Sequence, residues 1–246
     1  MAGRIGAWPA EPPVSRAPAR FVLYAQGRTG SHLLMHLLGA HPQLRCDGEV
    51  LNRQQWPGAW QWARRAAMRA PDVYLPWRAR SAAPLVWGCK VPIATSVRGL
   101  ARLQRQGWHI LFLQRRSRFD RALSWCVASL TGEFQRSDAL RPDTISVPID
   151  MFLAQLAFRR QWDDRSTQAM RAVPHVPLMY EDHLVDPTQR AATCARLFTA
   201  LHLPVIPVET GIRRSFDRPY RELVANYADV LDAFERSEAA HTPDAP

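Results

Sequence analysis

The sequence is short of lysine, cysteine and long apolar runs. Lys90 is its single lysine, so all but one of the 32 basic residues are arginine. The four cysteines lie far apart, without the paired spacing of a zinc site or a redox couple, and we expect reduced, mostly buried thiols. The sequence contains no stretch of about eighteen consecutive apolar residues, which a transmembrane helix would need. The N-terminal residues lack the apolar core of a signal peptide, so we expect a soluble, cytoplasmic protein.

Length and charge limit the domain organisation and the partners. The 246 residues, 47% of them apolar, suffice for one α/β domain with a continuous core. We place this domain at residues 20–234, between tails at 1–19 and 235–246 that carry proline, alanine and charge. The net charge of +10 indicates an anionic partner: a nucleotide, a nucleic acid or an acidic membrane.

Short apolar runs alternate with helical patterns along the chain. The predicted strands are 21–25, 86–91, 109–113 and 176–180, and the predicted helices are 32–40, 95–106, 118–130, 149–172 and 188–201. This alternation predicts a three-layer, P-loop-like α/β fold with a central parallel sheet and helices on both faces. Ser117 ahead of Asp120, and Asp186 ahead of Pro187, are typical helix starts.

The segment 53–84 interrupts the alternation with tryptophan and arginine. Its tryptophans are Trp56, Trp60, Trp62 and Trp77. Three interpretations stay open: a helical insertion whose tryptophans pack on the domain, an acceptor site whose indoles stack on sugar rings, or a basic amphipathic surface that rests on lipid.

The first predicted strand runs through a glycine-containing turn into a helix. Backbone N–H groups and the helix dipole converge on an anion at such a turn. We expect Gly27 and Gly30 to permit the tight path, Arg28 to supply a fixed positive charge, and Thr29 and Ser31 to supply hydroxyl donors. The turn is not a nucleoside-triphosphate P-loop, because the second half of that motif and its lysine are missing. A plain strand–turn–helix junction is the alternative.

A second basic cluster follows the predicted strand 109–113. If Ser117 caps the next helix, Ser124 lies roughly 12 Å along the axis from Arg116, at about 1.5 Å per residue. An arginine that folds back can cover much of this gap, so both side chains could hold one phosphate. A solvated basic helix face is the alternative.

Together these motifs resemble the sulfotransferases that use 3'-phosphoadenosine 5'-phosphosulfate (PAPS). Residues 21–52 most resemble bacterial carbohydrate sulfotransferases of the nodulation-factor type. The resemblance implies a 5'-phosphosulfate loop at Arg28–Ser31 and a 3'-phosphate site at Arg116 and Ser124. Tyr180-Glu181-Asp182 and Arg213-Arg214-Ser215 also look like family landmarks, and Arg213 and Arg214 are expected in the donor site.

The implied reaction moves a sulfuryl group from PAPS to a hydroxyl of a carbohydrate or glycolipid and leaves 3'-phosphoadenosine 5'-phosphate (PAP). Neither a metal nor a nucleic-acid partner is expected. The sequence departs from the cytosolic branch of the family, which usually has lysine in place of Arg28 and proline in place of Gly27. The histidine base of that branch has no clear match here.

Glu49 is our candidate general base. It follows the first helix and is expected near the carboxyl ends of the strands, where doubly wound sheets bind ligands. In the bacterial enzymes that it resembles, a glutamate in this region removes the acceptor proton. Asp47 is the second choice, and a surface carboxylate beside a turn glycine is the alternative. Lys90, at a strand end, could reach the pocket of the Arg28 loop from a neighbouring strand, or be simply a lysine at a strand end.

His32 and His36 lie four residues apart on the first predicted helix, a spacing that metal ligands use. No third ligand is evident and leucines surround them, which favours packing over metal binding. His32 lies in the first turn of the anion-binding helix, so we expect it to contact the donor.

Two other classes of protein compete with this interpretation. A kinase or NTPase is disfavoured by the missing P-loop lysine and by the lack of a convincing magnesium carboxylate. A nucleic-acid-binding protein would need a basic face with base-stacking aromatic side chains, which only the tryptophan-rich segment offers.

Overall fold

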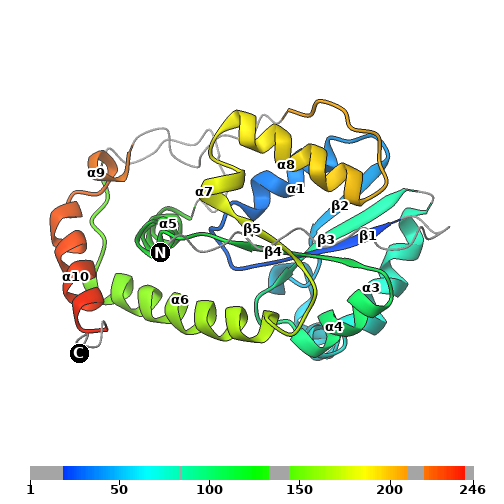
Figure 1. The fold of residues 1–246 in the computed structure, drawn as a ribbon. Helices are drawn as coiled ribbons and strands as arrows, with labels where there is room; N and C mark the ends of the chain where they lie inside the picture. The colour runs from blue at the N-terminus through cyan, green and yellow to red at the C-terminus, as the bar shows by residue number, and fades with distance from the viewer. Residues whose placement is uncertain (1–18, 84, 133–143, 210–218, 242–246) are drawn as a thin grey trace, which may run out of the picture. The chain divides into compact units, whose positions relative to one another are not determined.

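The computed structural model describes residues 19–83, 85–132, 144–209 and 219–241 (Figure 1). They belong to two compact units. The first unit comprises the described residues of Met1–Arg116 and Arg165–Thr210, and the second those of Ser117–Asp164 and Gly211–Pro246.

The first unit alternates strands and helices. Its elements are β1 (Arg20–Ala25), α1 (Ser31–Gly39), β2 (Leu44–Glu49), the 3-10 helices η1 (Arg53–Gln55) and η2 (Gly58–Trp60), α2 (Gln61–Arg69), α3 (Pro71–Ala79), the 3-10 helix η3 (Arg80–Ala82), β3 (Val86–Pro92), α4 (Val97–Arg105), β4 (His109–Gln114), β5 (Val176–Met179), α7 (Tyr180–His183) and α8 (Pro187–Ala200).

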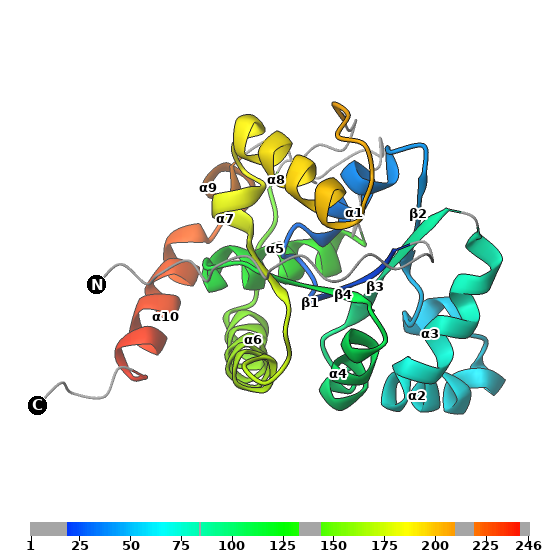
Figure 2. The ribbon, with the colours of Figure 1, turned by 45° about the vertical axis from the view of Figure 1, so that its right-hand side comes forward.

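The described strands form one five-stranded sheet in the order β2-β3-β1-β4-β5, and every neighbouring pair is parallel. Helices α1 and α8 cover one face of the sheet, and α2, α3 and α4 lie on the other (Figure 2). The predicted three-layer α/β fold with a central parallel sheet is therefore confirmed.

Apolar side chains of the strands pack against helices α1 and α8 and form a core on that face of the sheet. Phe21 and Leu23 of β1 join Leu34 and Leu38 of α1 and Phe198 of α8 in one cluster, and all five side chains are fully buried. Burial of such a side chain contributes about 1.5 to 3 kcal/mol relative to exposure. The central strand β1 is thus held by apolar packing as well as by its two neighbours.

Four of the five strands were predicted, and β2 was missed. The predicted strand 176–180 is one residue too long, because Tyr180 begins α7. The sequence of β2, LRCDGE, contains aspartate and glycine, which strands disfavour, and only Leu44 in it is fully buried. As an edge strand it pairs with β3 alone, so it needs little of the apolar pattern that identifies a central strand.

The second unit is helical where it is described. It contains α5 (Arg118–Thr131), α9 (Tyr220–Leu223), α10 (Tyr227–Ala239) and most of α6 (Ile149–Met170). The ring of Phe119 contacts the rings of Phe152, Tyr227 and Phe234 in its core. Helix α10 runs on to Ala239, beyond residue 234 where we expected the domain to end.

Several local predictions are confirmed. The Ser117 side chain accepts a hydrogen bond from the N–H of Asp120 at the start of α5, and Asp186 caps α8 ahead of Pro187. The four cysteines are free, and all but Cys46 are buried. Burial raises the pKa of the Cys126 and Cys194 thiols to about 11.

A separate finding concerns the helices of both units: among the described residues, no helix is both long and apolar enough to cross a membrane.

Gly88 of β3 offers a test of the packing around β1. A Cβ atom at Gly88 would lie 1.9 Å from Cε1 of Phe21, which is fully buried. Gly88→Ala should therefore lower the free energy of unfolding by about 1 to 3 kcal/mol, because Phe21 must leave its rotamer or the strands must shift. Gly58→Ala is the matched control, since a Cβ there meets no atom within 4 Å. Equal urea midpoints for the two variants would contradict this packing.

Candidate active site

The candidate site lies where the course of the chain reverses across the sheet. Strand β1 leads into α1 on one face, whereas its neighbour β3 leads into α4 on the opposite face (Figure 2). The loops therefore diverge beyond the carboxyl ends of β1 and β3. Open α/β sheets bind ligands at such a switch point.

The loop Gln26–Gly30 after β1 forms a tight turn at the N-terminus of α1. Arg28 and Gly30 have left-handed backbones, with φ of 66° and 85°. Such a φ is uncommon for a residue other than glycine, and strain of this kind gathers at ligand sites. Gly30 is the N-cap and makes no side-chain cap, so no cap side chain binds the first N–H groups of α1. These groups and the helix dipole suit an anion.

Two loop residues differ from expectation. The Thr29 side chain is buried, and its hydroxyl donates to the Gln26 carbonyl at 2.9 Å, so it closes the loop instead of facing a ligand. Gly27 has no positive φ, and a Cβ there would meet no protein atom within 4 Å. The turn itself therefore requires glycine at Gly30 only. Ser31 is the buried first residue of α1.

Tyr180 and Arg115, which follow β5 and β4 directly, brace this loop. A Cβ atom on Gly30 would lie 2.4 Å from Cδ2 of Tyr180, so the loop packs directly on the tyrosine ring. The Arg115 guanidinium lies 4.7 Å from the centre of the same ring. It also donates a hydrogen bond of 3.4 Å to the carbonyl of Arg28. One arginine thus connects β4, the start of α7 and the loop.

Positive charge gathers beside the loop. The pKa of His32 is lowered, first by partial burial and then by the nearby charges of His36, Lys90 and Arg28. The rings of His32 and His36 lie 4.5 Å apart, centre to centre. A bound anion would offset the repulsion between His32 and the charges around it, which suits the expected contact between His32 and the donor.

Glu49 and Lys90 meet at the ends of β2 and β3. Glu49 Oε2 lies 3.2 Å from Lys90 Nζ. The register explains the meeting: Cys46 pairs with Gly88 but Glu49 pairs with Lys90, so β2 carries one extra residue. This bulge includes Gly48, whose φ is 61°. Bulges near active sites commonly redirect a side chain, and here the bulge sets Glu49 opposite Lys90.

Asp47, the second-choice base, is engaged elsewhere. Its carboxylate lies 2.7 Å from Arg45 Nε and 3.4 Å from a nitrogen of Arg78, and its side chain is 10% exposed. Two guanidinium groups hold this carboxylate, so its role is structural, in the edge strand β2. The geometry therefore favours Glu49 over Asp47.

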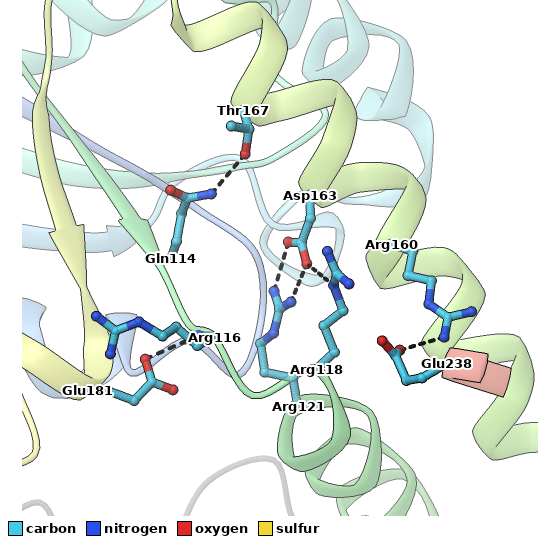
Figure 3. A network of polar contacts seen from close by, with 9 residues as sticks. All are labelled: Gln114, Arg116, Arg118, Arg121, Arg160, Asp163, Thr167, Glu181 and Glu238. Atoms are coloured by element: carbon cyan, nitrogen blue, oxygen red, sulfur yellow. Dashed lines mark hydrogen bonds and ion pairs between the residues drawn. The ribbon is translucent and has the colours of Figure 1, made fainter. Parts of the chain in front are cut away.

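Arg116, the expected 3'-phosphate ligand, is paired with carboxylates of the α7 segment. Its guanidinium forms an ion pair with Asp182, which raises the pKa of Arg116 through their hydrogen bond. Its backbone N–H donates to Glu181 at 3.1 Å (Figure 3). The Arg116 side chain is 57% exposed, so an incoming anion can reach it. Any anion bound there must compete with Asp182.

The remaining predicted ligands lie outside the first unit. Ser124 is a buried residue of α5 in the second unit, so its pairing with Arg116 stays a prediction. Within that unit, Arg121 and Arg118 both bind Asp163 (Figure 3). Arg213 and Arg214 lie outside the described residues.

Arg115 is the site residue that sequence reasoning missed. Its only signal in the sequence is its position directly after a buried strand, as the first of two adjacent arginines. Because that position also suits a solvated basic turn, only the contacts with Tyr180 and Arg28 identify its function. The roles of Asp182 beside Arg116 and of Tyr180 beneath Gly30 likewise depend on contacts between distant segments.

Comparisons with known proteins find the same fold in solved structures of two sulfotransferases. No protein-family model matches the chain, and no curated protein matches it in sequence. Solved structures do match: the sulfotransferase domain of the Synechococcus PCC 7002 olefin synthase aligns with a TM-score of 0.50 at 15% identity, over 96% of this chain and 99% of that one. Mouse sulfotransferase SULT7A1, complexed with PAP, aligns with a TM-score of 0.51 at 9% identity, over 92% and 86% of the two chains.

The bracing of the loop makes a prediction about its dynamics. Arg115→Ala removes the ring contact and the hydrogen bond to the Arg28 carbonyl. Because a hydrogen bond to a charged group contributes about 1.5 to 3 kcal/mol, amide exchange at Gly27–Gly30 should become at least about tenfold faster. Exchange within β1 should not change.

Arg98→Ala is the matched control, because Arg98 is an exposed arginine of α4. It should leave the exchange of the loop amides unchanged. If Arg115→Ala also leaves loop exchange at the wild-type rate, the loop does not depend on Arg115.

Proposed function

We propose that this protein transfers a sulfuryl group from PAPS to a hydroxyl of a carbohydrate or glycolipid. The observation that carries the proposal is the juxtaposition of two features at the carboxyl edge of the sheet. One is the strained, positively charged loop Gln26–Gly30, and the other is the Glu49–Lys90 pair at the ends of β2 and β3. The loop suits the anionic donor, and the Glu49–Lys90 pair suits the transfer of a proton.

The loop fits the 5'-phosphosulfate end of the donor. Backbone N–H groups at the start of α1 and the charge of Arg28 can face the anionic oxygens together. A ligand can approach the backbone at Gly27, because that position carries no side chain and a Cβ there would meet no protein atom within 4 Å. The mouse sulfotransferase of the same fold is complexed with PAP, which supports a nucleotide of this type.

Arg116 is proposed as the ligand of the 3'-phosphate. Its exposed guanidinium can release Asp182 and form a bidentate contact with a phosphate, which carries more charge than a carboxylate. Ser124, Arg213 and Arg214 complete the proposed donor site, as the sequence resemblance implies.

The proposed reaction is an in-line displacement at sulfur. The acceptor oxygen forms a bond to sulfur while the bond between sulfur and the bridging oxygen of the 5'-phosphate breaks. The sulfate ester and PAP are the products, and the acceptor proton passes to Glu49. Arg28, the loop N–H groups and Lys90 stabilise negative charge on the sulfonate and on the departing phosphate.

Lys90 has a second proposed task beside Glu49. Its side chain is 12% exposed and that of Glu49 is 30% exposed, so the carboxylate is the more accessible partner. An acceptor hydroxyl can therefore approach Glu49 from solvent while Lys90 fixes the carboxylate from within the sheet. The acceptor class rests on the resemblance to bacterial carbohydrate sulfotransferases.

Donor selectivity tests the Arg116 assignment. PAP should bind about tenfold to a hundredfold more tightly than adenosine 5'-phosphate, since a charge-assisted contact contributes about 1.5 to 3 kcal/mol. Arg116→Ala should remove most of this difference, and Arg98→Ala should retain it. Calorimetric titration with both nucleotides, and with ATP and single-stranded DNA as competing ligand classes, measures the selectivity. Equal affinities of the wild type for PAP and adenosine 5'-phosphate would refute the assignment.

Glu49→Gln tests the general base. The amide retains the shape of the carboxylate but cannot accept the proton, so turnover should fall by about a hundredfold to ten-thousandfold. PAP affinity should stay the same or rise, because a negative charge near the anionic donor is lost. PAP release with an acceptor that the wild type sulfates, together with calorimetry, measures both quantities.

The matched control is Glu209→Gln, which removes an exposed carboxylate of the same unit. It should keep wild-type turnover. Turnover of Glu49→Gln within about threefold of wild type would remove Glu49 as the base, and a parallel fall in PAP affinity would indicate a binding role.

A further inference from the structure

Helix α2 presents an exposed face of tryptophan and arginine. Its exposed residues Trp62, Arg65, Ala66 and Arg69 follow the spacing of one helix face. Trp60 stacks on Trp62 with ring centres 6.2 Å apart, and the two residues are 55% and 66% exposed. Two adjacent indoles therefore face solvent at the start of a basic helix.

The next helix repeats the pattern. Val73 and Trp77 of α3 are 70% and 62% exposed, and Arg80 follows at the spacing of the same face. Within the described chain, half of the exposed large apolar side chains belong to these two helices and the turn before them. Exposed apolar groups gathered in this way mark an interaction surface.

The inner sides of the same helices are anchored to the domain. The Met68 carbonyl accepts a hydrogen bond of 2.8 Å from the N–H of Ser96. Asp72 receives two hydrogen bonds, of 2.6 and 3.0 Å, from the Arg102 guanidinium. The segment thus has anchors other than its outward tryptophans, and of the four tryptophans in it only Trp56 is partly buried.

The charge of the segment is one-sided. Between residues 53 and 83 there are six arginines, and the single carboxylate, Asp72, is neutralised by Arg102. The arginines are Arg53, Arg64, Arg65, Arg69, Arg78 and Arg80. Arg78 pairs with Asp47 of β2, whereas Arg53, Arg65, Arg69 and Arg80 are exposed, so the segment that carries the exposed indoles keeps an excess of positive charge.

We propose that the outward faces of α2 and α3 dock onto an anionic lipid surface. Indole rings prefer the interface between headgroups and acyl chains, and arginines are attracted to anionic headgroups. A sugar-binding site needs hydrogen-bonding carboxylates or amides beside the stacking ring. The exposed faces carry tryptophan, valine, alanine and arginine instead.

The position of the segment gives the docking a consequence for the acceptor. The Trp56 indole donates a hydrogen bond of 3.0 Å to the carbonyl of Val50, directly after Glu49. A docked segment would therefore keep the end of β2 close to the lipid surface and favour a lipid-linked acceptor. This consequence rests on the proposed function, whereas the docking itself does not.

Sedimentation with vesicles tests the docking. The protein should sediment with vesicles of phosphatidylcholine and phosphatidylglycerol in equal amounts, and weakly with phosphatidylcholine alone. Trp60→Ala/Trp62→Ala and Arg65→Gln/Arg69→Gln should each lower the ratio of bound to free protein by about tenfold or more. Because all four side chains are exposed, both variants should keep the wild-type melting temperature and PAP affinity, which separates this test from that of the proposed function.

Two controls match the variants in chemistry. Phe158→Ala removes an exposed aromatic ring of α6, and Arg98→Gln/Arg105→Gln removes two exposed charges of α4. Both should bind vesicles as the wild type does. An equal loss of vesicle binding in Arg98→Gln/Arg105→Gln would show that binding depends only on net charge, and would overturn the proposal. Wild-type vesicle binding by Trp60→Ala/Trp62→Ala would overturn it too. If dextran then retards the wild type but not this variant in electrophoresis, the indoles bind sugar.

Discussion

The parallel alignment of five strands is the constraint on which the candidate site depends. Because every strand points the same way, the residues that follow each strand meet at one edge of the sheet. The buried strand β1 lies at the centre and carries the proposed anion-binding loop. Its neighbour β3 brings Lys90, and β2 brings Glu49 to Lys90. Apolar packing of the central strand thus determines where the polar groups lie.

The fold was largely predictable and the detailed site was not. Strands such as Phe21–Ala25 are buried on both faces, so their nearly continuous apolar runs identify them in the sequence. The edge strand β2 lacks that pattern, and its bulge at Gly48 has no periodic signal at all. The bracing of Gly30 by Tyr180 joins segments that are 150 residues apart, so contacts of this kind cannot be derived from local sequence.

Charge balance distinguishes the parts of the site. Glu49 and Lys90 neutralise one another, and Asp182 neutralises Arg116. Arg28 adds positive charge beside the loop, where burial and the neighbouring charges lower the pKa of His32 and so favour its neutral form. The positive charge of Arg28 thus lies beside the helix N-terminus, where backbone groups also attract anions. A dianionic nucleotide end suits this place better than a neutral ligand.

The central claim is that the carboxyl edge of β1 binds the sulfuryl donor, and a crystal structure of the protein with PAP tests it most directly. The account predicts the 5'-phosphate within hydrogen-bonding distance of N–H groups in Gly27–Ser31. It also predicts the Arg116 guanidinium on the 3'-phosphate, released from Asp182. A nucleotide bound at another edge of the sheet, or phosphates with no contact to the loop, would contradict the account.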